Sequence, residues 1–212
     1  MSGTEAWSWG ALFALGAFHG INPGMGWLFA VALGMQEHRS GAVWRSMIPL
    51  GAGHALAVAA ALLAALAAET IIPDPYVRWP VALLLVSLGI SRLIRHRHPR
   101  WASMRVDMKR LTAWSFLMAT AHGAGLMVLP IFLHMTETAG HPVHAGFAAG
   151  SGPLAGLLAT LVHAAGYLSV TAFTAWIVYE KLGVGLLRRA WINLDLIWAG
   201  ALIATGFLTL LT

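Results

Sequence analysis

Residues 15–34 read LGAFHGINPGMGWLFAVALG, an apolar stretch that a histidine, an asparagine and a proline interrupt near its middle. The stretch belongs to a longer run from Trp7 to Gly34 that contains no Asp, Glu, Lys or Arg. A helix of about 20 apolar residues is long enough to cross the hydrocarbon core of a bilayer. We therefore expect a membrane-spanning helix that carries a polar break at mid-depth.

The rest of the chain repeats this apolar character. Charged residues make up only 10% of the 212 residues, whereas a soluble domain carries roughly 25%. The composition therefore predicts an all-α fold: a polytopic integral membrane protein that forms a single transmembrane domain with six transmembrane helices. The five further apolar runs are Met47–Ala68, Trp79–Ile94, Leu111–His134, Ser151–Val178 and Ala190–Leu211.

Basic residues collect in alternate connections between these runs. The first, third and fifth connections hold two, seven and three Lys or Arg residues, and the second and fourth hold one and none. Cytoplasmic loops of membrane proteins collect positive charge. We therefore expect a multi-pass protein of the bacterial plasma (inner) membrane, with both termini outside and a basic cytoplasmic loop at residues 96–110. The excess of basic residues then reflects the membrane topology, and no nucleic-acid partner is expected.

The two halves of the chain, about residues 6–95 and 111–212, resemble one another. Each half has one central histidine in its first apolar run and one in its second, and a glycine in its third run (Gly89 and Gly206). Because three helices per half is an odd number, the second half enters the membrane upside down. We therefore predict two inverted three-helix repeats, an organisation common in secondary transporters, whose sites lie near the midplane.

Four histidines lie inside the predicted helices: His19, His54, His122 and His163. Any one of them is explained by a hydrogen bond across a helix pair. Ionisable groups at this depth usually face a cavity or each other, and the symmetric placement of all four favours a metal site or a proton relay. Imidazole is a common ligand of zinc, copper, nickel and iron.

Two prolines mark the candidate kinks or gates, Pro23 together with Gly24 in the first run and Pro130 in the fourth. Proline removes a helical hydrogen bond, and a loosened turn beside a buried histidine exposes carbonyl oxygens as extra ligands. Histidine and methionine without carboxylates favour a soft or borderline ion over magnesium or calcium. The candidate additional ligands or coupling groups are Asn22, Met25, Met118 and Asp195.

The segment at residues 15–34, followed by LGAGHALAV at residues 50–58, resembles the opening of nickel/cobalt exporters of the NicO type. These exporters belong to the LysE-like transporter superfamily, and the resemblance implies that His19 is a first-helix metal ligand with His54 as its partner. Asn22 stands where these exporters often have an acidic residue, and Met25 where they often have a second histidine. The whole chain also resembles a family of small bacterial membrane proteins with the same FHG-NPGMGW and AHGAGLMVLP segments, a likeness that implies no function.

We expect a transporter rather than an enzyme, one that moves a transition-metal cation of the nickel, cobalt, copper and zinc class with proton coupling. One alternative is a membrane metalloprotein that holds a haem or a dinuclear centre on the same histidines. Another is a LysE-like exporter of organic solutes. The expected partners are the lipid bilayer and the metal ion, and small-residue helix faces would permit a homodimer.

Overall fold

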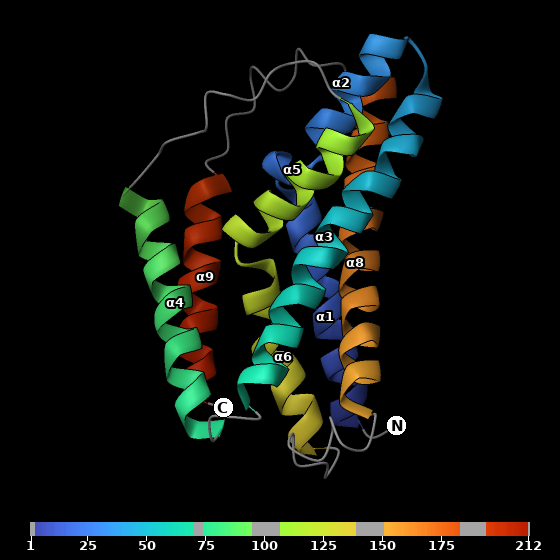
Figure 1. Ribbon diagram of the computed structural model, residues 1–212. Coiled ribbons are helices and arrows are strands. Elements are labelled where there is room, and N and C mark those ends of the chain that lie inside the picture. Colours follow the sequence, from blue (N-terminus) through green and yellow to red (C-terminus); the bar gives the residue numbers. More distant parts are fainter. Residues whose placement is uncertain (1–2, 70–73, 95–106, 139–150, 183–193, 212) are drawn as a thin grey trace.

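The computed structural model describes residues 3–69, 74–94, 107–138, 151–182 and 194–211. All regular elements in these ranges are helical and none is a strand, which confirms the all-α prediction (Figure 1). The elements are α1 (Gly3–Ile21), η1 (Pro23–Met25), α2 (Trp27–Glu37), α3 (Ser40–Glu69), α4 (Asp74–Ile94), α5 (Met108–Ala121), α6 (Ala124–Thr138), α8 (Ser151–Ile177), η2 (Val178–Leu182) and α9 (Leu194–Leu211).

Two of the described helices have the length and composition of membrane spans, Ser40–Ala68 and Pro153–Leu182. The pair Arg110–Ala121 and Ala124–Met135, bent by 61°, makes a third if it is counted as one span. Two shorter apolar helices, at residues 79–91 and 196–209, accompany them. Large apolar side chains on the long helices face outward, as lipid contact requires; examples are Leu56, Leu63, Leu157, Leu161 and Phe173.

The first expected span is divided into α1 and α2 by a short turn. Asn22 begins this turn, and its side-chain oxygen accepts a hydrogen bond of 2.9 Å from the backbone N–H of Gly24. Pro23 occupies the first position of η1, where no helical N–H bond is lost. Gly26 then takes a φ of 139°, a region that side chains disfavour. The polar break expected at this point is therefore a defined turn.

The fourth expected span is divided as well, at His122 and Gly123. Gly123 has a φ of 72°, and the two flanking helical segments meet at 61°. Pro130 was the expected kink of this span, but it lies inside α6, beyond the bend. The bend therefore depends on the left-handed backbone of glycine rather than on the missing N–H of proline.

The helices pack in pairs that join the two halves of the chain. α1 packs along α8, α3 along α5, and α4 along α9, while α3 also contacts α8 near the centre (Figure 1). The α4–α9 pair stands at one side of the bundle, and the start of α1 lies at the same end as the end of α9. Each half therefore buries its helices mainly against the other half.

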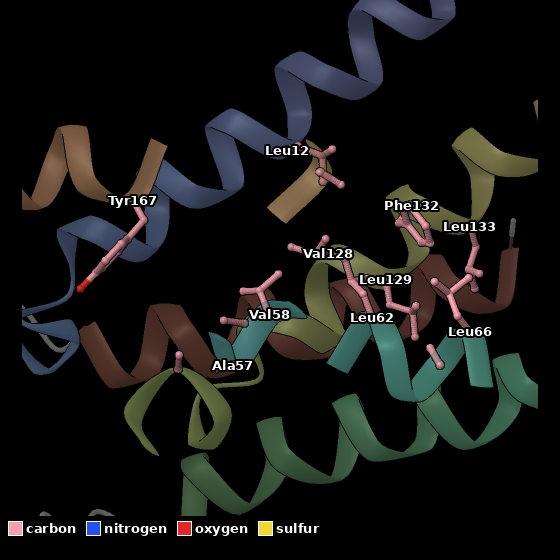
Figure 2. Close-up of a cluster of buried hydrophobic side chains, with 14 of the residues drawn as sticks. Leu12, Ala57, Val58, Leu62, Leu66, Val128, Leu129, Phe132, Leu133 and Tyr167 are labelled. Atoms are coloured by element: carbon pink, nitrogen blue, oxygen red, sulfur yellow. The ribbon is translucent and has the colours of Figure 1, made fainter. Parts of the chain in front are cut away.

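One cluster of buried apolar side chains joins α1, α3, α6 and α8 (Figure 2). Leu12, Val58, Leu62, Val128 and Phe132 are at most 1% exposed within it. The α1–α8 contact is closer still, because a Cβ at Gly16 would overlap the carbonyl oxygen of His163 and one at Gly166 would overlap that of Phe13. Small residues permit this close approach of two backbones. It brings the histidine-bearing parts of α1 and α8 together.

This close approach predicts a position-specific response to a single methyl group. The variant Gly16→Ala should lower the free energy of unfolding by about 1–3 kcal/mol, because α1 and α8 must separate to admit the Cβ. Gly10→Ala is the matched control, since Gly10 lies in the same helix with open space around it. Thermal unfolding of both variants in detergent measures the difference; equal midpoints would contradict the α1–α8 packing described above.

Candidate functional site

Three of the four predicted histidines converge in the centre of the bundle. His19 of α1, His54 of α3 and His163 of α8 have no exposed surface. Their ring centroids lie 5.6 Å apart for His19 and His54, 5.0 Å for His19 and His163, and 5.3 Å for His54 and His163. We call these three residues the histidine triad.

The backbone orients two rings of the triad. Nδ1 of His19 lies 2.8 Å from the carbonyl oxygen of Leu15, and Nδ1 of His163 lies 3.2 Å from that of Leu12. Because a carbonyl oxygen only accepts, Nδ1 carries the hydrogen in each ring and the neutral imidazole keeps a lone pair on Nε2. Neither Nε2 has a hydrogen-bond partner among the described residues. Metal-ligating histidines are typically held in this way through their other nitrogen.

His54 is held by a different kind of contact. Its ring stacks on Tyr167, with centroids 4.0 Å apart and planes 9° from parallel. Within the part of the chain that the structure describes, neither of its ring nitrogens has a hydrogen-bond partner. The hydroxyl of Tyr167 donates a 2.6 Å bond to the carbonyl oxygen of Met25. Tyr167 therefore ties the position of His54 to the first helix break, while leaving both imidazole nitrogens available.

His122 lies at the second helix break and resembles His19 in its local setting. It is buried, and its Nδ1 lies 2.8 Å from the carbonyl oxygen of Met118, four residues earlier, as in His19. Trp198 of α9 bridges the two histidines. Its ring centroid lies 4.5 Å from that of His19 and 5.4 Å from that of His122, edge-on to both. The fourth histidine is thus connected to the triad through an indole.

The carbonyl oxygens at the two breaks, expected as extra ligands, already accept hydrogen bonds. Trp27 Nε1 donates to Ile21 at 2.9 Å, and Trp114 Nε1 donates to Gly24 at 3.2 Å. Met25 accepts from Tyr167, and Trp198 Nε1 donates to His122 at 3.1 Å. Sequence reasoning missed these four aromatic donors. The available signal was a chain that contains ten tryptophans, a residue that seeks a polar partner when it is buried.

The remaining predicted ligands occupy varied places. Asn22 uses its oxygen to cap the turn, so its amide nitrogen is the atom left without a partner. Met25 is buried in the apolar cluster of Figure 2. The methyl group of Met118 lies beside Gly24 of the first break. Asp195 belongs to the first turn of α9, and its side chain lies outside the described part of the chain.

The triad has the spacing of metal ligands without their full geometry. Imidazoles that share one zinc ion have ring centroids about 5 Å apart, given Zn–N distances of about 2.1 Å. Among the side chains that the structure describes, however, no three His, Asp or Glu residues are placed to hold a metal ion in common. His141 and His144, and His96 and His98 of the basic loop, lie outside the described residues.

Comparison with known proteins adds no relative to this arrangement. No protein-family model, no curated protein and no solved structure matches the chain. The resemblance to nickel/cobalt exporters therefore remains an expectation from the sequence.

Proposed function

We propose that this chain is a six-span protein of the bacterial inner membrane, built from two inverted three-helix repeats, that transports a transition-metal cation through the histidine triad. One observation carries the proposal. His19 and His163 each have Nδ1 fixed on a backbone carbonyl and an unpartnered Nε2 inside a buried cluster. Lone pairs gathered in this way attract a cation.

The packing of the helices supports the inverted repeat. The first span of each half packs on the second span of the other half: α1 packs on α8, and α5 packs on α3. The third spans, α4 and α9, pack on each other. A two-fold axis lying in the membrane plane exchanges the halves in this manner. The matching hydrogen bonds of His19 and His122 to carbonyls four residues earlier add a local likeness.

The route of the chain supports six crossings. If α1 with α2, and α5 with α6, each count as one broken span, then the chain alternates between the two ends of the bundle. The start of α1 and the end of α9 then lie at one end, and the α2–α3 connection with Arg39 lies at the other (Figure 1). The distribution of basic residues assigns this second end to the cytoplasm.

The side chains around the triad favour a bare cation as the cargo. Among the described residues, the buried polar groups are serine, threonine, asparagine and histidine, with no Asp, Glu, Lys or Arg. An organic zwitterion would lack a charged partner for either of its ends. Magnesium and calcium prefer several oxygen ligands, whereas imidazole suits zinc, copper, nickel and cobalt.

His54 is the residue that we assign to proton coupling. No backbone group of the described residues fixes its tautomer, because neither ring nitrogen has a hydrogen-bond partner there. An imidazole must be neutral to bind a metal ion, so binding displaces any proton that the ring carries. A metal ion moving in one direction and a proton moving in the other would then use the same ring.

The topology can be tested by cysteine labelling, because the natural chain has no cysteine. The variants Ala6→Cys and Gly41→Cys place a single thiol at exposed positions near the start of α1 and the start of α3. A membrane-impermeant maleimide should label Ala6→Cys on intact cells and Gly41→Cys only after the membrane is opened. Labelling of both variants from the same side would reject an odd number of crossings between these positions.

Transport can be tested with purified protein in liposomes. Uptake of Zn²⁺, Co²⁺, Ni²⁺ and Cu⁺ is measured in turn, and at least one ion should move faster than in empty liposomes. The variants His19→Ala, His54→Ala and His163→Ala should each lower that flux by at least about tenfold, because each removes a ligand.

The matched control for this experiment is His134→Ala, since His134 is an exposed histidine on α6. It should retain the flux of the natural protein. Uptake that survives the simultaneous replacement of all three triad residues would exclude the triad as the transport site. Absence of flux for all four ions would reject transport of a transition metal.

A further inference from the structure

Trp198 lies where the second helix break meets the histidine triad. It is 2% exposed, and its Nε1 donates a 3.1 Å bond to the carbonyl oxygen of His122. Its ring stacks on Phe18, with centroids 4.9 Å apart and planes 3° from parallel. Phe18 is the neighbour of His19 in α1. The indole is therefore held from both sides, by a hydrogen bond to α5–α6 and by a ring stack on α1.

Trp198 also connects the α4–α9 helix pair to the site. It belongs to α9, which packs chiefly on α4, and it forms a separate buried cluster with Leu85, Met127 and Leu202. A movement of the α4–α9 pair would accordingly move the indole relative to His19 and His122. The hydrogen bond to His122 and the stack on Phe18 are the contacts that such a movement would break.

We propose that Trp198 is a positioning residue that keeps His122 apart from the triad, so that the cation has two stations within the protein. The first station is the triad, with three imidazoles, and the second contains His122. The indole contacts the rings of both His19 and His122 edge-on, with centroids 4.5 Å and 5.4 Å away. The cation passes from one station to the other when the indole swings aside. This inference rests on the proposed function.

Counting the imidazoles around a bound ion tests the two-station arrangement. The full-length protein is purified in detergent and loaded with Zn²⁺, and X-ray absorption spectroscopy gives the number of imidazole ligands. The natural protein and His122→Ala should both show three. Trp198→Ala should show four, because His122 can then join the triad, and the double variant Trp198→Ala with His122→Ala should return to three.

Two further variants separate the ring of Trp198 from its hydrogen bond. Trp198→Phe loses the bond to His122 but retains an aromatic ring in the same place, so it should show three imidazoles. Trp27→Ala is a control that removes another buried indole. Trp27 donates to the carbonyl oxygen of Ile21 at the first helix break, and it belongs to a different apolar cluster from Trp198. Trp27→Ala should also show three imidazoles. If removal of any buried indole loosened the protein enough to admit His122, Trp27→Ala would show four.

Two results would overturn the inference. One is a lower count in His122→Ala than in the natural protein, because His122 would then already be a ligand. The other is a count of three in Trp198→Ala. If Trp198→Ala does not fold, Trp198→Leu takes its place. It also removes the indole, so it should show four imidazoles, and a count of three would overturn the inference. Zinc binding that disappears in the triad variants while either overturning result is found rejects only the two stations. A natural protein that binds none of Zn²⁺, Co²⁺, Ni²⁺ and Cu⁺ rejects the proposed function as well.

Discussion

The hydrogen bonding of a few buried carbonyl oxygens controls how this bundle is assembled. Each helix break frees backbone carbonyls inside an apolar environment, where an unsatisfied group costs several kcal/mol. Aromatic donors satisfy four of them: Trp27 to Ile21, Trp114 to Gly24, Tyr167 to Met25 and Trp198 to His122. Three of these donors come from other helices, α5, α8 and α9, so satisfying the breaks also brings those helices to the centre.

The arrangement of the triad follows from these contacts. Tyr167 bonds to the first break and presents its ring face to His54, while the glycine contacts of α1 and α8 set His163 against the carbonyl of Leu12. The Nδ1 atoms of His19 and His163 thus donate hydrogen bonds to backbone carbonyl oxygens. What remains for chemistry is a pair of Nε2 lone pairs and the unbonded ring of His54.

Local signals in the sequence predicted the helical class, the buried histidines and the turn at Pro23, because hydropathy and a helix-breaking residue act over a few neighbours. The site contacts were not predictable in this way. Trp114 is 90 residues from the carbonyl that it caps, and Tyr167 is 142 residues from its own. Asn22 was expected as a ligand, but it serves the turn that it begins. The bend at Gly123 rather than at Pro130 reflects a positive φ that only the folded backbone reveals.

The proposed repeat makes Trp198 the source of asymmetry between two similar halves. Gly89 and Gly206 are equivalent positions in the repeat, and the residues eight positions earlier (206 − 8 and 89 − 8) are Trp198 and Val81. Of these two positions, the one in α9 carries an indole and the one in α4 carries a valine. The carbonyl of the second break is bonded from α9, the third helix of its own half. In the proposed transport, two equal stations would hold a cation with equal free energy. An indole beside one station and three imidazoles at the other would give the two stations different affinities for the cation.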